Sequence, residues 1–313
     1  VITIGTIEMM IDGVFSLERS FRIFGSFYDL VTASGDIMAV LVLVSCLIFI
    51  FRRLFLNIRR FSGKEMTKLS SFDAIIALFI IIFLMISLLT MNIGYISIHH
   101  SDIVGSYPIS SFLVTFVSSW DLQDIVLLHQ VSWWTHILLV LIFLNELPYS
   151  KHFHVVMSIP NVYFSNIENL GKLNNLSSVT NEVKLMMDPN ADPYTTPTTD
   201  VAPDSFGAKD VTDLNWVQLM NSYSCTECGR CTSECPANQT GKLLSPRKIM
   251  MDTRKRLKEV GKNIDKYGKE YNDNKTLLND YISAEEIWAC TTCNACTQAC
   301  PLNIDPLSII IDL

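Results

Sequence analysis

Eight of the nine cysteines lie in two short runs that share one spacing. The runs are CTECGRCTSECP, from Cys225, and CTTCNACTQACP, from Cys290, and both read C-x2-C-x2-C-x3-C-P. Three thiolates at this spacing bind one face of an iron–sulfur cubane, and the fourth, followed by proline, binds the other cluster of a two-cluster protein. The sequence therefore predicts two [4Fe–4S] clusters. The predicted ligands are Cys225, Cys228, Cys231 and Cys300 for one cluster, and Cys290, Cys293, Cys296 and Cys235 for the other.

A pair of structural zinc sites is the alternative interpretation of these runs. A tetrahedral zinc ion takes two C-x2-C pairs, which explains neither the third x2 step nor the repeated x3-Cys-Pro ending. Such dense runs are also typical of a reducing compartment and not of a disulfide framework. The ninth cysteine, Cys46, lies in an apolar stretch.

Histidines in and beside an apolar segment are the second group that can do chemistry. His136 and His154 are 18 residues apart, which is five helical turns, so they share a face if one helix continues through both. A membrane-buried imidazole is a candidate haem ligand. Alternatively, His136 hydrogen-bonds a neighbouring helix and His154 joins His152 in a basic interfacial patch. His129 is a weaker candidate for a quinone or haem pocket.

Apolar segments near the length of about 20 residues that spans a bilayer must position these histidines. They cover 30–51, 74–91 and 125–147, and we take 1–11 to be the end of a fourth helix that the chain enters partway. Buried soluble helices are the alternative. Residues 52–68 hold six Lys or Arg against one Glu, whereas residues 93–124 hold three Asp and no Lys or Arg. By the positive-inside rule, we expect everything beyond Leu147 to lie in the cytoplasm.

Composition divides the chain into a membrane part and a polar part. It is 49% hydrophobic and 18% charged with a net charge of −7, which excludes an ordinary soluble enzyme and argues against nucleic acid as the main partner. We predict an all-α fold with a helix over 245–261, whose basic residues face solvent or dock an acidic partner. The predicted domains are a transmembrane bundle over 1–164, a linker over 165–214 and a cytoplasmic two-cluster domain over 215–313.

The cysteine motifs, with SPRKIMMDTR after the first and EEIWACTTC opening the second, resemble the helical two-cluster ferredoxin domain found in the iron–sulfur C subunit of heterodisulfide reductase. The iron–sulfur subunit of anaerobic glycerol-3-phosphate dehydrogenase is a relative of that family. The resemblance covers residues 215–313. It implies a domain that relays single electrons to a partner bearing cysteine-rich catalytic domains.

The segment WWTHILLVLIFLNELPYSKHFHVV resembles the last membrane helix of the nitrate reductase gamma subunit family of cytochrome b proteins. In that family two haem-ligating histidines stand 18 residues apart around a Pro-aromatic-Ser-basic step, here Pro148 to Lys151. The resemblance implies haem b at His136 and His154, either as two haems or as one haem held through His154 near the cytoplasmic side. In that family the opposite axial histidines lie on an earlier helix that starts on the cytoplasmic side, which here would be the helix cut at Val1. Residues 1–98 contain no histidine, so the visible portion of that helix holds neither ligand.

Together these features predict an electron-transfer subunit of the bacterial inner membrane. Electrons would pass between a cytoplasmic partner, the clusters, haem b and a quinone, which the resemblance suggests is menaquinone. The partner would be a cysteine-rich reductase subunit or a flavoprotein, because the sequence shows no flavin motif or nucleophile constellation of its own. The alternatives are a membrane redox sensor and a haem-free anchor for a soluble reductase.

Overall fold

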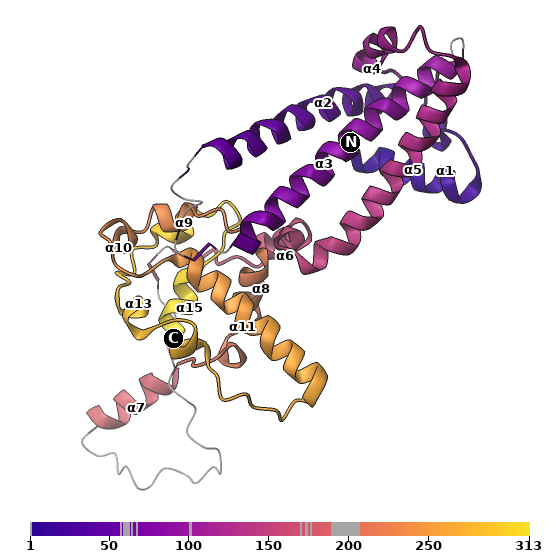
Figure 1. The fold of residues 1–313 in the computed structure, drawn as a ribbon. Helices are drawn as coiled ribbons and strands as arrows, with labels where there is room; N and C mark the ends of the chain where they lie inside the picture. The colour runs from indigo at the N-terminus through magenta and orange to yellow at the C-terminus, as the bar shows by residue number, and fades with distance from the viewer. Residues whose placement is uncertain are drawn as a thin grey trace. The chain divides into compact units, whose positions relative to one another are not determined.

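The computed structural model is helical, as the sequence predicts, and the part of the chain it describes contains no regular strand (Figure 1). The chain divides into two compact units, Val1–Ser150 and Lys151–Leu313, which are described separately. The structure describes residues 2–56, 58, 63, 65–66, 68–99, 102–169, 171–172, 175, 177–188 and 207–313.

Three helices of the first unit are long and apolar enough to cross a membrane: α2 (Ser26–Phe55), α3 (Lys68–Ile98) and α5 (Leu122–Glu146). They confirm three of the predicted segments. The fourth segment lies in α1 (Ile2–Phe15), whose 14 residues rise about 21 Å. A short helix, α4 (Pro108–Leu113), lies in the chain between α3 and α5.

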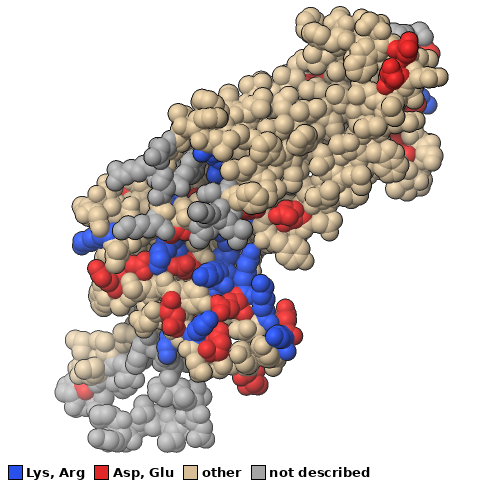
Figure 2. Space-filling model, viewed as in Figure 1, with Lys and Arg blue, Asp and Glu red and all other residues tan. Residues whose placement is uncertain are grey.

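The long helices expose apolar side chains, as lipid-facing helices do. Leu41 of α2, Phe83 of α3 and Leu138 of α5 are each more than half exposed. On the face shown in Figure 2, the surface over these helices is almost uncharged. Helix α3 packs against both α2 and α5, around a small core that includes Ala39 and Leu84. Bilayer lipid would replace water at this exposed surface.

Asp36, the one acidic residue in the predicted segment 30–51, serves the fold of the first unit. Its carboxylate accepts backbone N–H bonds from Ile109 at 2.8 Å and Ser110 at 2.9 Å, and it also accepts the Ser110 hydroxyl. The first N–H groups of a helix have no partner within it, so Asp36 caps α4 from a distant helix.

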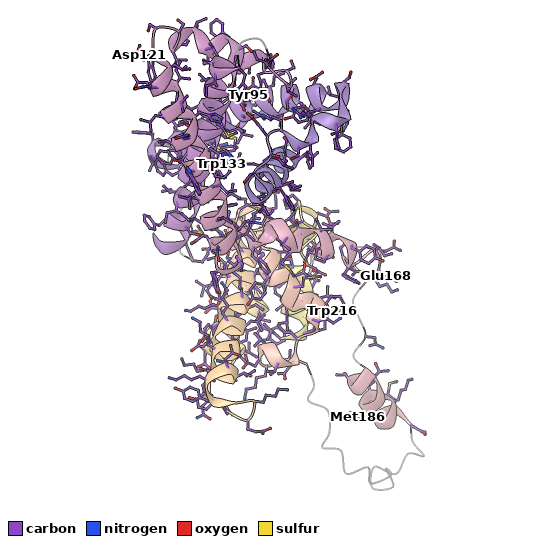
Figure 3. The ribbon with its side chains drawn as sticks, turned by 90° about the vertical axis from the view of Figure 1, so that its right-hand side faces the viewer. Tyr95, Asp121, Trp133, Glu168, Met186 and Trp216 are labelled. Atoms are coloured by element: carbon purple, nitrogen blue, oxygen red, sulfur yellow. The ribbon has the colours of Figure 1, made fainter. Side chains whose placement is uncertain are left out.

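The second unit is built from shorter helices around one core. Ile249, Leu277, Ile282 and Ile309 are fully buried in it. Trp216 (labelled in Figure 3) has its ring centroid 4.8 Å from that of Phe164, at an interplanar angle of 80°. The helices are α6 (His154–Tyr163), α7 (Ser177–Met187), α8 (Trp216–Ser224), α9 (Arg230–Ser233), α10 (Pro236–Gln239), α11 (Pro246–Tyr267), α12 (Leu277–Asp280), α13 (Ala284–Trp288), α14 (Ala295–Gln298) and α15 (Pro306–Asp312).

Helix α11 confirms the predicted helix over 245–261 and extends it. It begins after Ser245, whose hydroxyl accepts the Lys248 N–H, and ends at Gly268, where φ is 90°. The basic residues of this helix, which the sequence predicts to face solvent or a partner, fall into a buried group and an exposed group. Arg254 and Arg256 are buried and form ion pairs inside the unit, while Lys255 is exposed. Two of the helix's basic residues, Arg254 and Arg256, therefore stabilise the fold.

The helix that carries His136 does not continue to His154. Helix α5 ends at Glu146, short 3-10 turns follow, and α6 begins at His154 in the second unit. Pro148 lies at the break, and a proline has no N–H to continue a helix. The shared-face argument for these two histidines, which required an unbroken helix, is therefore wrong.

The boundary between the units lies at residues 150 and 151, earlier than the predicted end of the membrane domain at residue 164. Helix α6 packs on α8, and the Asn161 amide donates to the Leu302 carbonyl at 2.8 Å. Residues 151–164 thus belong to the second unit. Helix α7 lies in the predicted linker 165–214, whose residues 189–206 fall outside the described part of the chain.

Candidate functional site

Two cavities of the second unit are each lined by four cysteines. The first lies between the loop after α8, helix α9 and the loop after α14. The second lies between the start of α10 and the loop that leads into α14. The cysteines of the first cavity are Cys225, Cys228, Cys231 and Cys300, and those of the second are Cys235, Cys290, Cys293 and Cys296. The last cysteine of each motif thus lines the cavity of the other motif.

The backbone of the two cysteine loops repeats along with the spacing. Glu227 and Gly229 in the first loop have φ of 58° and 75°, and Thr292 and Asn294, 65 residues later, have φ of 53° and 59°. Residues in the left-handed conformation turn the chain sharply. In such turns successive backbone N–H groups can form a concave site that favours an anionic ligand. The two loops therefore have matching, costly conformations of the kind found at binding sites.

The chemistry of the thiols fits iron–sulfur clusters. Burial raises the pKa of Cys225 to about 11 and that of Cys296 to about 12, and it raises the pKa of Cys231 further. Buried thiolates are stable only beside positive charge, and a bound metal supplies that charge and deprotonates the thiol. Among the described residues, no three His, Cys, Asp or Glu side chains converge closely enough to hold a single metal ion.

Basic side chains surround the first cysteine cavity. Arg247, which is 1% exposed, lines it, and Arg254 donates to the Cys225 carbonyl at 2.9 Å. Arg254 also pairs with Glu227, and the Lys151 ammonium lies 3.7 Å from the same carboxylate. A cluster with four thiolate ligands is anionic, so the buried Arg247 charge offsets it. Arg247 belongs to the stretch SPRKIMMDTR, but that stretch alone assigned it no role.

His136 lies in the first unit, buried between α5 and α3. Its Nδ1 lies 3.1 Å from the Leu84 carbonyl oxygen and 3.0 Å from the Ser87 hydroxyl. A bond to a carbonyl requires the proton on Nδ1, which leaves the Nε2 lone pair as the acceptor. Ligating histidines are oriented in this way. The hydrogen bond to a neighbouring helix, which was predicted as the alternative to haem ligation, is present. The same hydrogen bond is also compatible with haem ligation through Nε2.

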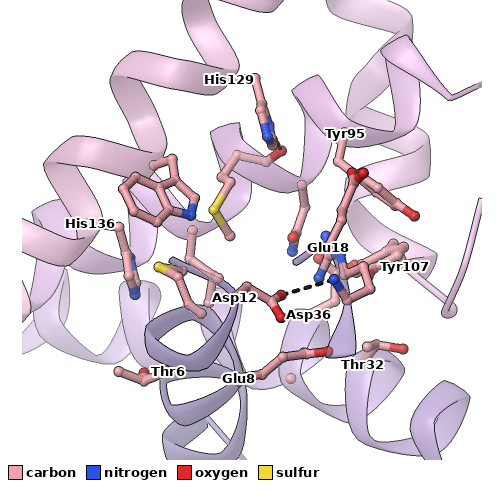
Figure 4. A pocket seen from close by; sticks show the side chains of 18 of the residues that line it. Thr6, Glu8, Asp12, Glu18, Thr32, Asp36, Tyr95, Tyr107, His129 and His136 are labelled. Carbon is pink, nitrogen blue, oxygen red and sulfur yellow. Dashed lines mark hydrogen bonds between the residues drawn. The ribbon is translucent and has the colours of Figure 1, made fainter. Parts of the chain in front are cut away.

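His129 has the same arrangement two turns earlier on α5. Its Nδ1 lies 3.0 Å from the Met91 carbonyl oxygen. Gly94 allows this close approach, because a Cβ there would stand 2.8 Å from the His129 Cβ. His129 and His136 both point into one cavity of about 500 Å³ (Figure 4). The structure thus brings two of the three predicted histidines to one site.

This cavity lies between α1, α2, α3 and α5 and has two kinds of wall. The apolar wall includes Met9, Leu88 and Trp133, and Gly5 faces open space. The side chains of the polar wall come from segments that are distant in the sequence. Its side chains include Glu8, Asp12, Glu18, Arg19, Asn92, Tyr95 and Tyr107.

The remaining histidines lie elsewhere. His154 is the first residue of α6 in the second unit, partly buried, with Nδ1 3.0 Å from the Lys151 carbonyl oxygen. Its ring centroid lies 6.2 Å from that of His152. His99 is 3.4 Å from Glu18 at the surface of the first unit, and His100 falls outside the described residues.

Comparisons with known proteins identify the cysteine-bearing domain. Residues 224–304 match the family described as the 4Fe-4S dicluster domain. The chain is 30% identical to a probable iron-sulfur-binding oxidoreductase, FadF, of Bacillus subtilis, over 82% of this chain and 37% of that protein. It is 24% identical to the EtfAB:quinone oxidoreductase of Syntrophomonas wolfei, over 66% of this chain and 28% of that protein.

Shorter matches lie among ferredoxin-type proteins. A probable membrane-anchored ferredoxin of Chromohalobacter salexigens is 32% identical over 34% of this chain and 18% of its own length. The C subunit of a CoB-CoM heterodisulfide reductase of Methanosarcina acetivorans is 33% identical over 30% of this chain and 45% of that protein. No solved structure matches.

These matches define the class of protein. The chain carries a 4Fe-4S dicluster domain, is homologous to iron–sulfur oxidoreductases, and has three helices able to span a membrane. It spans between about a quarter and two fifths of the length of the first two relatives.

Proposed function

We propose that the chain is a membrane electron-transfer subunit that passes single electrons between a cytoplasmic redox partner, two [4Fe–4S] clusters, haem b and a quinone. The observation that carries this proposal is the sorting of eight cysteines into two sets of four, with Cys235 and Cys300 exchanged between the motifs. That exchange is the ligand pattern of two-cluster ferredoxins. The homology to iron–sulfur oxidoreductases supports it.

The chain's own residues hold and tune the clusters. Cys225, Cys228 and Cys231 with Cys300 would bind one cluster, and the other four cysteines would bind the second. Clusters of this kind accept and release one electron at a time when bound. The Thr292 N–H, which donates to the Cys290 sulfur at 3.4 Å, and the buried Arg247 would stabilise the anionic ligand set. Arg254, through its bond to the Cys225 carbonyl, fixes the first loop.

Haem b would be bound through His136 and His154. For His136 the support is its Nδ1–H bond to the Leu84 carbonyl and its burial in a candidate membrane helix. For His154 the support is the corresponding bond to Lys151. The resemblance of residues 133–160 to the nitrate reductase gamma family adds to both. Each of the two histidines would hold a haem of its own, so we propose one haem or two.

The names of two relatives support the proposed quinone and the proposed partner, in addition to the features of this chain. One relative is named an EtfAB:quinone oxidoreductase and others are C subunits of heterodisulfide reductases. We propose menaquinone as the electron carrier in the membrane, with His129 at its pocket or at the haem. The cytoplasmic partner would be a flavoprotein or a reductase with cysteine-rich domains, which also holds the substrate-converting site.

The proposed location is the bacterial inner membrane, with the second unit in the cytoplasm. Arg52 and Arg53 lie in the last turn of α2, at the start of the basic segment 52–68. The positive-inside rule places that end in the cytoplasm. The other basic residues of the segment, Arg59, Arg60, Lys64 and Lys68, have side chains outside the described part of the structure.

A haem-free anchor is the second candidate function. It is favoured by the likeness to a probable membrane-anchored ferredoxin, in which the membrane part would only hold the cluster domain at the bilayer. A membrane redox sensor would likewise need no haem. Both alternatives predict an absent b-type spectrum, whereas the proposed relay requires it.

Cofactor analysis of the purified full-length complex tests the proposed function. We expect about eight iron and eight sulfide ions per chain. We also expect a b-type haem, whose reduced absorbance band develops when menadiol is added. Iron without haem would favour the anchor or the sensor. Zinc in place of iron would refute the cluster assignment.

A further inference from the structure

The segment between α1 and α2 folds back toward the bundle through two strained residues. Ser16 and Arg19 both have φ of 53°, the left-handed region that residues other than glycine rarely occupy. The short 3-10 helix η1 (Ser20–Phe24) follows. Such strain persists only where surrounding contacts impose it, and it is concentrated at functional sites.

Two carboxylates of α1 impose this conformation. Asp12 accepts the backbone N–H of Arg19 at 2.9 Å and that of Ser20 at 3.1 Å. Glu8, which is 5% exposed, accepts the backbone N–H of Phe21 at 3.0 Å. Both acids are therefore committed to the backbone of the turn. Together they fix the position from which the Arg19 side chain enters the cavity.

Aromatic residues hold the Arg19 side chain. Its guanidinium carbon lies 4.3 Å from the Tyr95 ring centroid and 5.4 Å from that of Tyr107. These are cation–π contacts, which leave the N–H edge available. One guanidinium nitrogen lies 3.5 Å from the Tyr28 hydroxyl, at the limit of a hydrogen bond. Among the described residues, no carboxylate forms an ion pair with this guanidinium.

Arg19 lines the cavity into which His129 and His136 point (Figure 4). A guanidinium has five N–H donors, and most of those of Arg19 have no protein acceptor in the described structure. The cavity has the size of small-ligand sites, and Met9, Leu88 and Trp133 give it walls for a flat apolar ring. The expected ligand therefore combines an oxygen acceptor with a conjugated ring system.

We infer that Arg19 binds a carbonyl oxygen of the quinone head group and fixes that head group in the cavity between α1, α2, α3 and α5. The inference rests on the proposed quinone-linked function and names the residue that recognises the ligand. A charged donor gives a stronger hydrogen bond than a neutral one, and the cation is pre-positioned by the turn. Arg19 is a binding residue and transfers neither proton nor electron.

A haem propionate has the same oxygen chemistry and is the competing occupant. The two sources differ in what Arg19 would control. A quinone contact affects the concentration of quinol needed for haem reduction, whereas a propionate contact affects haem content and its absorbance.

The test uses the purified, haem-loaded full-length complex and menadiol as the probe. Anaerobic haem reduction is followed as a function of menadiol concentration for the wild type, Arg19→Gln and Arg19→Lys. The matched control is Arg22→Gln, an exposed arginine in η1 that does not line the cavity. We expect Arg19→Gln to raise the half-saturating menadiol concentration about tenfold or more, because a charge-assisted hydrogen bond is lost. Arg19→Lys should restore part of the affinity, and Arg22→Gln should match the wild type.

An unchanged half-saturating concentration in Arg19→Gln, with normal haem content, would overturn the inference. Loss of haem from Arg19→Gln without a change in menadiol affinity of the remaining haem-loaded protein would assign Arg19 to a propionate and overturn it as well. A wild type without a b-type band, or with a band that menadiol leaves oxidised, would instead refute the proposed function itself. These failures are therefore distinguishable.

Photolabelling keeps the inference testable if the variants do not fold. An azido-naphthoquinone activated on the wild-type complex should label peptides that line the cavity, including the one that contains Arg19, and excess menadione should suppress the labelling. Specific labelling confined to peptides outside the cavity would exclude Arg19 as the quinone-binding residue.

Discussion

Cys235, the last cysteine of the first motif, lines the same cavity as Cys290, the first cysteine of the second motif. The two residues are 55 positions apart in the chain. Each proposed cluster would thus cross-link segments that are distant in sequence. A ligand that binds only the folded state of a protein stabilises that state. The folding of the second unit should therefore depend on both clusters.

Replacement of Cys235 tests the crossed ligation. Cys235→Ser should lose or alter the cluster bound by the second motif, because three of its four ligands come from Cys290, Cys293 and Cys296 and the fourth is removed. Electron paramagnetic resonance of the reduced protein should show one cluster signal of wild-type shape and iron content reduced by up to about half. Cys46→Ser is the control, since Cys46 is buried in α2 and lines neither cysteine cavity. Selective loss of the first-motif cluster would contradict the assignment.

The hydrogen bond at His136 predicts different results for two neighbouring substitutions. His136→Ala removes the Nε2 ligand and should abolish the absorbance of its haem. Ser87→Ala removes one partner of Nδ1 but leaves the Leu84 carbonyl, so we expect the haem to remain. Spectra of the dithionite-reduced membranes distinguish the variants. Retention of the full b-type band in His136→Ala would show that this histidine is only a packing residue.

The buried charge of Arg247 should raise the reduction potential of the first-motif cluster. Reduction adds negative charge, and a nearby cation in a site of low dielectric favours the reduced form. Arg247→Gln should therefore lower that potential by tens of millivolts and leave the other cluster unchanged. Redox titration followed by electron paramagnetic resonance measures this shift, with the exposed Lys255→Gln as control. Equal shifts of both clusters in Arg247→Gln would refute a local effect.

An ion pair between Asp273 and Arg256 predicts how the stability of the second unit depends on pH. The Arg256 guanidinium, 2.6 Å away, lowers the pKa of Asp273 to about 2 from an ordinary value of about 3.8. A carboxyl with a depressed pKa in the folded state contributes stability above its unfolded pKa, and that contribution is lost as the pH falls through the folded pKa. The Asp273 contribution should be complete above about pH 4 and disappear toward pH 2.

Thermal unfolding between pH 2 and pH 5 checks this dependence. Asp273→Asn should be less stable than the wild type at pH 5, and the difference should shrink as the pH falls. Lys262→Gln, an exposed change on the same helix as Arg256, serves as the control. A difference between Asp273→Asn and the wild type that stays constant over this range would rule out the ionised pair as its source.

The features that follow from local sequence were predictable, and those that depend on distant partners were not. Cysteine spacing predicted the three cysteines of each motif that line one cavity, because the C-x2-C-x2-C geometry is set within one loop. Apolar length predicted α2, α3 and α5. The burial of Arg256 was not predictable, since Asp210 lies 46 residues away and Asp273 comes after the helix ends.

The histidine site shows the same division. Residue type and place in an apolar segment made His136 and His129 candidates, but their shared cavity depends on α1, α2 and α3 as well as α5. Pro148 was visible in the sequence, yet the resemblance favoured a continuous helix through it. The inferred role of Arg19 depends on the turn that Asp12 and Glu8 stabilise by accepting backbone N–H groups. Such hydrogen bonds cannot be predicted from residue type alone.

Anaerobic mixing of the pre-reduced full-length complex with menadione tests the central claim most directly. The cluster signals are followed by electron paramagnetic resonance in rapidly frozen samples, for the wild type and for His136→Ala. The account predicts that menadione oxidises the clusters of the wild type, taking two electrons and two protons to form menadiol, and that His136→Ala slows this oxidation at least about tenfold. Clusters that stay reduced in the wild type, or that are oxidised equally fast in both proteins, would contradict electron transfer through a haem at His136.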